Sequence, residues 1–441
     1  MHLLIIAFEF APLNVGGTMR PLRFANYMVQ KGHSVTVICG NYTGSEWERK
    51  EDQGLLSKIN PAIRIIRVPI KKIDYLSKFI RTGYSFFMDE VWSRWGRNVM
   101  KAIKKEMAFQ PPSVVLVTMP PFSLYQLVLW LKRNYQVPVI ADFRDAWTLW
   151  VNSPFASRLH FTRFWNQEDK VLKTADAVLV TSPVTQKDFK NHHQGISSSK
   201  LYYIPNSFDQ YEAASFHSFN SEKEKLRIVY VGTFYYNPIS QALINKKWYQ
   251  KKVYQWLQYI PRKEDWLYRS PLFFFKALDL LLQEYPEYIS RLEVVVAGIE
   301  PGWWTEMVNT DRLQKVVKHI GPVSKERSVQ LQKEADILLL TSNKVEMGDD
   351  YSIAGKTYEY FAARKPIWGV VCNGAQQWIL EQSGIALCLD PDDTPSSSVK
   401  MHNFLQGKIV LRENQPFINQ FKTKLVGDGF EEVALSLVNK K

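Results

Sequence analysis

Short apolar segments rich in Val, Ile and Leu recur along the chain and alternate with segments of helical periodicity. Segments that are apolar at nearly every position indicate strands buried on both faces, which is typical of parallel sheets covered by helices. The first set comprises Leu3–Phe8, Ser34–Cys39, Ile63–Val68, Val114–Thr118, Val137–Asp142, Ala177–Thr181 and Leu201–Ile204. The second set comprises Arg227–Gly232, Leu292–Ala297, Val317–Ile320, Ile337–Thr341, Pro366–Val371 and Ile385–Leu389. The pattern predicts an α/β protein with two doubly wound, Rossmann-like domains.

A polar segment without a clear period, Gln210–Lys225, separates the two sets of strands. We therefore expect an N-terminal domain over residues 1–209, a linker over 210–225 and a C-terminal domain over 226–425. Phe430–Val438 has the pattern of a terminal helix, so residues 426–441 are expected to form a C-terminal helix. A chain of 441 residues is long enough for these domains.

Composition excludes several classes of protein. Hydrophobic residues make up 46% of the chain and charged residues 22%, which excludes a disordered chain. The widely spaced Cys39, Cys372 and Cys388 form neither a disulfide framework nor a metal-binding pattern, and the eight histidines do not cluster. We expect no metal and no cofactor. Met1–Glu9 lacks a basic leader region and is predicted to be the first buried strand, so the expected location is the cytoplasm.

The chain is basic and rich in aromatic residues, with a net charge of +13 and 14 Trp. This combination favours an anionic partner: nucleic acid, an anionic membrane surface or a phosphorylated substrate. No nucleic-acid recognition motif accompanies the charge, so nucleic acid is disfavoured. Two segments concentrate basic and aromatic side chains, Ser240–Ser270 strongly and Ile70–Met107 more weakly.

Ser240–Ser270 holds seven Lys or Arg and seven Trp or Tyr, with Glu264 and Asp265 as its two acidic residues. It follows a predicted strand where a helix should begin almost directly, so we expect an insertion early in the second domain. Basic aromatic segments bind the interfacial layer of membranes. The alternative is a surface hairpin that packs its aromatic side chains on its own domain. The first reading predicts peripheral attachment to the inner face of the membrane.

The segment Gly355–Ile367 has a Gly-Lys pair at the expected start of a helix and a glutamate three residues later. Helix N-termini attract phosphate because their free N–H groups and the helix dipole favour negative charge. Lys356 would add a cation, and Glu359 would accept hydrogen bonds from a sugar diol. The segment therefore predicts a site for a nucleoside diphosphate. The alternative is an amphipathic helix whose lysine and glutamate face solvent.

Further candidates follow the predicted strands, because doubly wound sheets bind ligands at the carboxyl ends of their strands. Gly16-Gly17 precedes a helix carrying Arg20, and Gly232-Thr233 follows the first strand of the second domain. Asp142–Trp147 places two acids and an arginine after a buried strand, which favours either a functional loop or an Asp–Arg pair that fixes the loop. Gly321–Ser324 precedes a helix and could hold a base edge with backbone groups.

These segments, in this order, resemble glycosyltransferase family 4, whose members are retaining enzymes of the GT-B fold. The resemblance is carried by Gly16-Gly17 with Arg20, Lys31–Val37, Asp142–Trp147, Ile204–Asn206, Val231–Phe234, Ile320–Ser324, Ala335–Leu339 and Gly355–Ile367. It is similar to members that build bacterial surface polysaccharides. The resemblance implies two Rossmann-like domains facing a cleft, and transfer of a sugar from a nucleotide-sugar to a glycan or lipid-linked acceptor. Such transfer relies on positioning and charge stabilisation without a metal.

The resemblance also implies roles for individual residues. Asp145, Lys356 and Arg20 are the implied catalytic residues. The implied donor-binding residues are Gly16, Gly17, Gly232, Thr233, Pro322, Val323, Asp350, Tyr351, Gly355 and Glu359.

The chain departs from the family pattern at three places. Many members have a second glutamate eight positions before the first, where this chain has Tyr351, so Asp349 or Asp350 is the candidate replacement. Members tend to have a basic residue just after the strand that ends at Gly232, but Thr233–Gln241 has none. Insertion residues are the candidates to replace it: Lys246, Lys247, Arg262 or Lys263. The loop Thr118–Pro121 also lacks the histidine that many members place near the acceptor.

These departures leave two alternative functions open. Nucleotide-sugar epimerases share the two-domain fold, and a fold does not determine a function. A non-catalytic partner subunit that binds nucleotide-sugar would also tolerate the missing glutamate and the missing basic residue.

Overall fold

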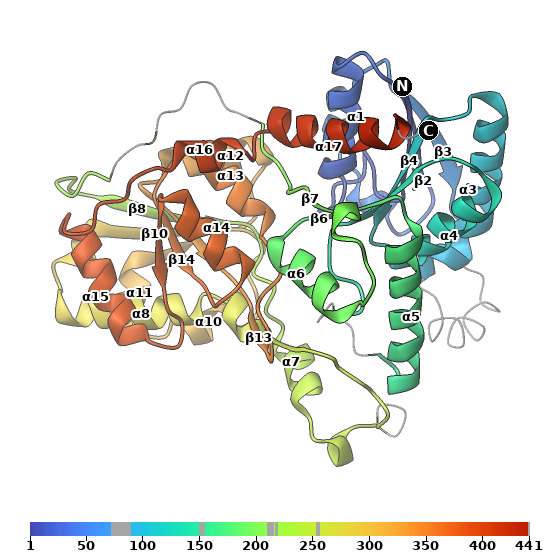
Figure 1. Ribbon diagram of the computed structural model, residues 1–441. Helices are drawn as coiled ribbons and strands as arrows, with labels where there is room; N and C mark the ends of the chain where they lie inside the picture. Colours follow the sequence, from blue (N-terminus) through green and yellow to red (C-terminus); the bar gives the residue numbers. More distant parts are fainter. Residues whose placement is uncertain (72–89, 150–154, 210–215, 217–218, 253–255, 440–441) are drawn as a thin grey trace. The chain divides into compact units, whose positions relative to one another are not determined.

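The computed structural model describes the chain except for residues 72–89, 150–154, 210–215, 217–218, 253–255 and 440–441 (Figure 1). The described residues form two compact units. The first unit contains Met1–Ser207, Leu257–Pro261 and Thr423–Lys441, and the second contains Phe208–Trp256 and Arg262–Lys422. Each unit is built around its own parallel sheet, which confirms the predicted fold class.

The first unit has a seven-stranded parallel sheet in the order β3-β2-β1-β4-β5-β6-β7. Its strands are β1 (His2–Ala7), β2 (Ser34–Asn41), β3 (Arg64–Pro69), β4 (Val114–Met119), β5 (Val139–Phe143), β6 (Ala177–Val180) and β7 (Leu201–Tyr203). Its helices are α1 (Met19–Gln30), α3 (Glu90–Phe109), α4 (Tyr125–Asn134), α5 (Arg158–Thr174), α6 (Pro183–His192) and α17 (Thr423–Val438).

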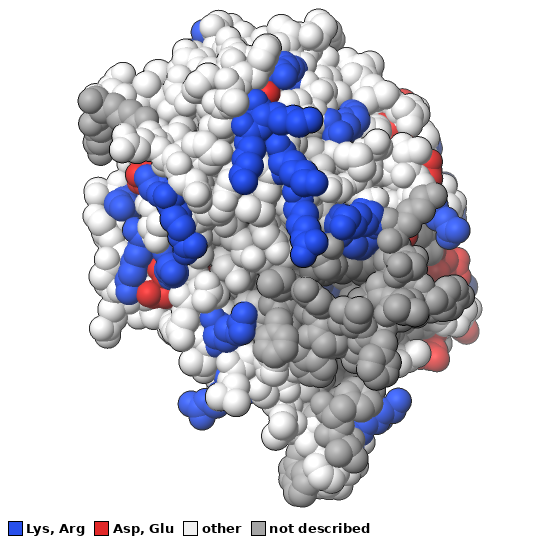
Figure 2. Space-filling view, turned by 90° about the vertical axis from the view of Figure 1, so that its right-hand side faces the viewer, with Lys and Arg blue, Asp and Glu red and all other residues white. Residues whose placement is uncertain are grey.

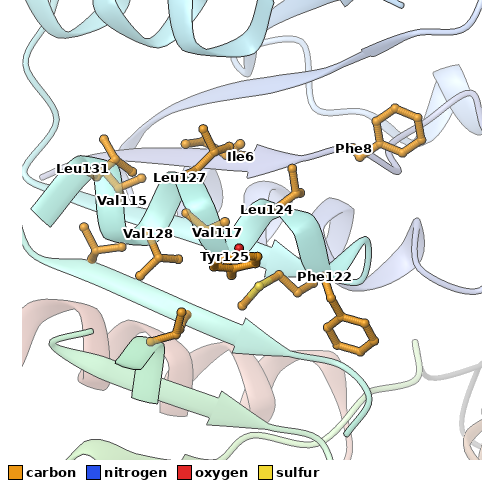
Figure 3. Packing of buried hydrophobic residues seen from close by; sticks show 14 of the residues in the cluster. Ile6, Phe8, Val115, Val117, Phe122, Leu124, Tyr125, Leu127, Val128 and Leu131 are labelled. Atoms are coloured by element: carbon orange, nitrogen blue, oxygen red, sulfur yellow. The ribbon is translucent and has the colours of Figure 1, made fainter. Parts of the chain in front are cut away.

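The apolar strands of this sheet supply both of its faces. Along β1, Leu4 and Ile6 point into one hydrophobic cluster, and Leu3 and Ile5 point into the cluster on the opposite face. This alternation follows from the two-residue period of a strand. Figure 3 shows the first cluster, in which the apolar side of α4 packs on β4. The near-continuous apolar pattern of the sequence is therefore explained by helices on both faces.

The terminal helix α17 covers the second face of the first sheet beside α1. The rings of Phe24 and Phe430 stack with centroids 4.3 Å apart, and His33 Nε2 lies 2.8 Å from Glu431 Oε1. The helix begins at Thr423, so the expected boundaries at 425 and 426 fall inside it. The last helix of the sequence thus belongs to the core of the first unit, where its Phe430 is fully buried.

The second unit has a six-stranded parallel sheet in the order β11-β10-β8-β12-β14-β15 and a small antiparallel pair, β13-β9. Its strands are β8 (Leu226–Val231), β9 (Lys263–Asp265), β10 (Leu292–Ala297), β11 (Val317–His319), β12 (Ile337–Thr341), β13 (Lys344–Glu346), β14 (Ile367–Val370) and β15 (Ala386–Leu389). Its helices are α7 (Pro238–Asn245), α8 (Leu272–Glu284), α9 (Tyr288–Arg291), α10 (Trp304–Met307), α11 (Asp311–Val316), α12 (Lys325–Glu334), α13 (Gly355–Ala363), α14 (Ala375–Ser383), α15 (Thr394–Leu405) and α16 (Gln415–Asn419).

The expected linker, Gln210–Lys225, lies partly outside the described residues. Its described part is no free linker, because Phe216 and Phe219 pack against the hydrophobic clusters of the second unit. Arg291 also donates a 2.8 Å hydrogen bond to the carbonyl oxygen of Ser221. The sequence did not indicate this packing, because isolated aromatic residues in a polar segment carry no periodic signal.

The expected insertion, Ser240–Ser270, divides into three parts. Helix α7 and the turn after it extend away from the sheet of their unit (Figure 1). Leu257–Pro261 pack with the first unit, where the backbones of Tyr259 and Phe155 exchange hydrogen bonds of 2.9 and 3.0 Å. Arg262–Ser270 return to the second sheet and form β9 and a 3-10 turn, Trp266–Arg269.

The aromatic side chains of this insertion divide in the same way. Trp266 donates a 2.8 Å hydrogen bond to Glu264, and the ring of Tyr268 lies 4.4 Å from that of Phe273. Tyr249 and Trp256, by contrast, are 57% and 47% exposed. The second half of the insertion therefore packs its aromatic side chains on the protein. The first half exposes basic and aromatic side chains.

The weaker basic-aromatic segment, Ile70–Met107, lies partly outside the described residues. Its described part is mostly α3, whose Trp95 is fully buried and whose Arg94 forms an ion pair of 2.5 Å with Glu46. The outer side of α3 exposes basic side chains at Arg97, Lys101, Lys104 and Lys105. Figure 2, which views the molecule from the right-hand side of Figure 1, shows Lys and Arg gathered on this side with few acidic side chains.

Candidate functional site

The carboxyl end of the second sheet has a backbone arrangement that is typical of ligand-binding sites. Strand β8 lies between β10 and β12 in the sheet. The chain runs from β8 to β10 and β11 on one side and then crosses to β12 on the other side. A doubly wound sheet binds ligands where the strand order reverses in this way. Gly232, Gly298 and Gly321 follow β8, β10 and β11. A side chain on Gly298 would collide with the carbonyl oxygen of Gly232, and the Gly298 N–H donates a 2.9 Å hydrogen bond to Gly321.

The side chain of Lys356, at the start of α13, lies over the backbone of Gly232. A Cβ atom at Gly232 would lie 2.6 Å from Lys356 Cε and 2.8 Å from its Nζ, and Gly232 has a φ of +120°. Glycine is therefore required there both for the backbone conformation and for the lysine above it. Lys356 Nζ donates a 2.9 Å hydrogen bond to the Tyr230 hydroxyl and lies 4.4 Å from the centre of that ring. The structure thus brings the predicted Gly232 and Lys356 into contact.

Lys356 is half-buried. Burial lowers the pKa of its ammonium group, and the nearby Arg269 lowers that pKa further, while Glu359 raises it. A bound anion would favour the charged lysine and offset the cost of burial. Helix α13 begins beside the lysine without a side-chain cap within the described residues. Its first N–H groups and Lys356 together form an arrangement suited to phosphate.

Glu359 lies one turn further along α13 and is exposed. Its Oε2 accepts a weak hydrogen bond of 3.4 Å from Gln332 on α12. The carboxylate is thus available to a ligand beside the lysine, as the predicted ribose contact requires. Gly355 is also exposed, and a Cβ atom there would meet nothing within 4 Å.

Of the two candidates to replace the second glutamate, Asp349 is exposed and Asp350 is buried, as is Tyr351 at the position of the glutamate itself. Asp350 is 1% exposed, and its Oδ1 accepts hydrogen bonds of 3.0 and 2.7 Å from the backbone and hydroxyl of Ser352. Its Oδ2 has no hydrogen-bond partner among the described residues, and burial raises the pKa of this carboxyl group. Tyr351 is 5% exposed. Asp350 therefore keeps an acceptor oxygen that has no partner among the described residues but is itself buried, and Tyr351 is also mainly part of the interior.

The remaining predicted donor-binding residues lie at the ends of β8 and β11. Thr233 is exposed, and its carbonyl oxygen accepts a 3.3 Å hydrogen bond from Tyr230. Pro322 is exposed, whereas Val323 packs against a hydrophobic cluster of the second unit. Ser324 then caps α12. These positions leave backbone groups near the carboxyl edge, but the geometry gives no side-chain role to Val323.

In the first unit, the predicted catalytic Arg20 is part of a buried ion pair. It is 5% exposed, and its Nη2 lies 2.8 Å from Asp142, which is fully buried and also accepts a 2.9 Å hydrogen bond from Thr118. Arg20 Nη1 donates a further 2.8 Å hydrogen bond to the carbonyl oxygen of Pro205. These contacts join α1, β4, β5 and the chain after β7. They favour a structural role for Arg20 and give no support to its predicted catalytic role.

The glycine pair lies against a second ion pair of the same unit. Arg144 Nη1 lies 2.8 Å from Glu9 Oε2, and a side chain at Gly17 would collide with both residues. Gly17 is therefore needed to make room for protein groups, whereas Gly16 is exposed and has open space around it. Asp145 follows β5 and is half-buried. Asp142 and Arg144 thus both hold the loop in place, but through partners outside it, Arg20 and Glu9.

Sequence reasoning missed two residues of the second unit, Arg269 and Glu264. Arg269 lies near Tyr235 after β8 and contributes to the lowered pKa of Lys356, and Glu264 is a buried acid that forms an ion pair with Arg269. Both belong to the segment Ser240–Ser270, but its charge count does not distinguish residues of the exposed turn from residues that return to the sheet. The available signal was that one acidic residue, Glu264, stands among three aromatic residues, Tyr259, Trp266 and Tyr268.

Among the residues that the structure describes, no group of three or more His, Cys, Asp or Glu could hold a metal ion. Also within the described ranges, no helix is long and apolar enough to cross a membrane.

The family model for Glycosyltransferase Family 4 matches residues 16–212. Over this part, the chain belongs to glycosyltransferase family 4. It is therefore a glycosyltransferase that uses a nucleotide-sugar donor, which confirms the predicted class of enzyme. A sequence search of curated proteins found no match.

Solved structures share the fold across almost the whole chain. Sucrose-phosphate synthase from Thermosynechococcus elongatus is 12% identical, with a TM-score of 0.63 and full coverage of both chains. The lipopolysaccharide outer core galactosyltransferase WaaB is 11% identical, with a TM-score of 0.59 and 99% coverage of both chains. Anabaena HepE in complex with UDP-glucose is 12% identical, with a TM-score of 0.55, and 99% of this chain and 100% of HepE are covered. At these identities the likeness shows the GT-B fold.

Proposed function

We propose that this glycosyltransferase transfers a sugar, with retention of configuration, to a hydroxyl group of a glycan or lipid-linked acceptor in cell-surface polysaccharide synthesis. The contact between Lys356 and Gly232 at the carboxyl edge of β8 carries the donor half of this proposal. It holds a cation and the free N–H groups of α13 at one place. The diphosphate of the donor would lie there, and Glu359 would bind the ribose one turn away.

The proposed chemistry depends on charge stabilisation. As the bond between sugar and diphosphate breaks, negative charge grows on the departing phosphate, and Lys356 is placed to stabilise it. Because burial disfavours the charge on the free lysine, the departing anion also restores a favourable environment for it. Asp350 Oδ2 would accept a hydrogen bond from the donor sugar if donor binding uncovers this buried oxygen. The reaction is proposed to need no metal.

A screen for ligands followed by a transfer assay tests the proposal. Nucleoside diphosphates and nucleotide-sugars of several bases are compared by thermal shift, because a ligand of the folded state raises the melting temperature. The stabilising nucleotide-sugar is then assayed with and without a lipid-linked acceptor, in the presence and absence of EDTA. Transfer that is unaffected by EDTA is expected. Interconversion of sugar isomers without transfer would favour an epimerase, and rescue of an EDTA-inhibited reaction by a divalent cation would overturn metal independence.

The acceptor half of the proposal includes docking on an anionic membrane surface by the exposed turn of the insertion. Lys246, Lys247 and Lys252 are exposed there, near Tyr249 and Trp256. Each such cation contributes up to about 1 kcal/mol near an anionic surface, and aromatic rings suit the headgroup layer.

Vesicle sedimentation tests the docking. Changing the three lysines of the turn to Gln should reduce binding to vesicles of phosphatidylglycerol and phosphatidylcholine, whereas the corresponding changes at Lys101, Lys104 and Lys105 of α3 should not. If the turn variant binds as well as the parent protein, the insertion is not the docking segment. A loss with the α3 variant alone would move the docking surface to that helix.

A further inference from the structure

A cavity of about 390 Å³ lies at the carboxyl ends of β14 and β15. Its walls come from the residues that follow these strands, from α14 and α15, and from β13 with the loop after it. In the strand order β8-β12-β14-β15, β14 lies two strands from β8, which is about 10 Å at the usual spacing of neighbouring strands. The cavity is therefore separate from the contact between Lys356 and Gly232. Its volume falls within the range of small-molecule sites, about 300–1,000 Å³.

Two loops that form one wall of this cavity are locked together. The Asp350 N–H donates a 3.1 Å hydrogen bond to the carbonyl oxygen of Asn373, and the Ala375 N–H donates one of 2.7 Å to the carbonyl oxygen of Asp350. Gly374 has a φ of +143°, and a Cβ atom there would lie 2.3 Å from the same Asp350 oxygen, so this contact requires glycine. The backbone that carries Asp349 and Asn373, which both line the cavity, is thereby fixed.

The protein uses only some of the polar groups in the lining. Lys344 Nζ donates a 2.6 Å hydrogen bond to Asp392 Oδ2, and both side chains contact the hydroxyl group of Tyr268. Three exposed side chains of the lining have no hydrogen bond or ion pair within the described part of the chain: Asp349, Asn373 and Lys400. They present a carboxylate that accepts hydrogen bonds, an amide that does both, and an ammonium group that donates.

The apolar part of the lining includes Val371, Leu389 and the thiols of Cys372 and Cys388. Burial raises the pKa of each thiol to about 12, so both are neutral at ordinary pH. Because the thiolate is the nucleophile and the metal ligand, neutral thiols give the cavity an unreactive surface. The lining is thus suited to binding a molecule and not to forming a bond with it.

The charges of the lining indicate the class of ligand. Carboxylates outnumber lysines along it, so a phosphate or another anion would meet net negative charge. An uncharged molecule rich in hydroxyl groups suits the three free side chains, since a hydroxyl donates to a carboxylate and accepts from an ammonium or amide group. A sugar has this chemistry, and an amino sugar adds a cation that the acidic lining favours.

We propose that this cavity binds one neutral or amino-substituted sugar residue of a glycan, as a carbohydrate site distinct from the donor site. The inference goes beyond the proposed function, because such a site needs no nucleotide. A growing glycan held there would stay with the enzyme between successive transfers. A free sugar presents the same chemistry, so the experiment compares the two sources.

Saturation-transfer NMR on the whole chain, with a nucleoside diphosphate absent or saturating, tests the site. The panel contains glucose, galactose and mannose, each with its amino sugar, its uronic acid and a neutral oligosaccharide. We expect a neutral or amino sugar to bind, and its uronic acid to bind about tenfold more weakly or less, because of like-charge repulsion. The oligosaccharide should bind at least as tightly as the monosaccharide, and the nucleoside diphosphate should displace neither. A monosaccharide that binds while its oligosaccharide does not would overturn the assignment to a glycan.

Variants of the lining locate the bound sugar. Asp349→Ala and Lys400→Ala each should weaken sugar binding about tenfold, as expected for loss of a charge-assisted hydrogen bond. Both side chains are exposed, so the melting temperature of each variant should match that of the parent. Glu346→Ala is the matched control, since it removes an exposed acid of β13 that is not part of the lining. Asp349→Asn should reduce the preference for an amino sugar over its neutral counterpart.

Three outcomes would overturn the proposal. Displacement of the sugar by the nucleotide-sugar, but not by the nucleoside diphosphate, would assign the cavity to the sugar of the donor. Equal sugar binding by the parent and by both alanine variants of the lining would place the bound sugar elsewhere. Failure of every neutral and amino sugar of the panel to bind the parent would remove the site. None of these outcomes decides whether the enzyme transfers a sugar, which the transfer assay tests separately.

Discussion

The carboxyl ends of the two sheets both carry buried charged residues, but the protein satisfies them to different degrees. In the first unit, Asp142 accepts hydrogen bonds from Arg20 and Thr118, and Arg144 is paired with Glu9. In the second unit, one carboxylate oxygen of Asp350 has no hydrogen-bond partner among the described residues. The guanidinium group of Arg269 is paired there with Glu264 through one of its nitrogens. Comparable residue types thus hold loops together at one edge and remain available to a ligand at the other.

The difference shows that a charged loop after a strand is not by itself a functional signal. A buried charge with complete hydrogen bonding is costly to unpair and has little left to offer a substrate. A buried charge with incomplete hydrogen bonding costs stability, and a ligand can offset that cost. The comparison therefore predicts stability effects from the first edge and ligand effects from the second.

The largest effect on stability should come from the first edge. Asp142→Ala leaves the Arg20 charge buried without its partner, which typically costs about 3–5 kcal/mol. Denaturant unfolding followed by tryptophan fluorescence measures the loss. The control is Lys132→Ala, which breaks a half-exposed pair with Asp176 and should cost at most about 1 kcal/mol. Equal losses in the two variants would remove the contrast between the edges.

At the second edge, Lys356→Ala should lower kcat by about a hundredfold, because the charge that it stabilises grows in the transition state. The KM for the donor should change less. Lys325→Ala is a matched control, since it removes an exposed lysine from the start of the neighbouring helix α12. A loss shared equally between binding and turnover would assign Lys356 to uniform binding of phosphate.

A smaller effect is expected at Glu359. Glu359→Ala should weaken donor binding by about 1.5–3 kcal/mol through loss of charge-assisted hydrogen bonds to the ribose. Titration with the nucleoside diphosphate measures the change, and thermal unfolding should remain as in the parent because the side chain is exposed. Glu381→Ala, an exposed glutamate of α14, provides the control. An unchanged dissociation constant in folded Glu359→Ala would remove this residue from the site.

The smallest effect, and one of opposite sign, is expected at Asp350. Burial raises the pKa of its carboxyl group above the ordinary value of 3.8, so the folded state binds the proton more tightly than the unfolded state. Stability should therefore fall as the pH rises from about 3.8 through the raised pKa. Asp350→Asn should melt at a higher temperature than the parent at neutral pH, and the difference should disappear below the ordinary pKa. A variant that melts lower at neutral pH would show that the carboxylate is already satisfied.

The sequence predicted the sheets well because their strands are apolar on both faces, as β1 illustrates. It also singled out Gly232 and Lys356, which the structure brings into contact, because a glycine after a strand and a charged helix start are local signals. The donor-binding roles of these residues and of Glu359 stay predictions. It could not locate the partners of Arg20, since Asp142 and Pro205 are far away in the chain. Arg269 was missed for the same reason: its position depends on the ladder between β9 and β13.

The assignment of α17 shows the same limit. Its apolar pattern predicted a helix near the end of the chain, but periodicity says nothing about which sheet a helix covers. The contacts of Phe430 with Phe24, and of Glu431 with His33, decide that question.

The return of the chain to the first unit has a practical consequence. The chain leaves this unit at Ser207 and re-enters it at Thr423, and their hydroxyl groups lie 3.3 Å apart. The N–H of Phe208 also bonds the carbonyl oxygen of Phe421, so the second unit begins and ends at one place. Apart from Leu257–Pro261, which pack with the first unit, residues 208–422 therefore form one insertion whose two ends are adjacent. Probes attached to the two chain termini would both report on the first unit, so a sensor of donor binding needs its labels within residues 208–422.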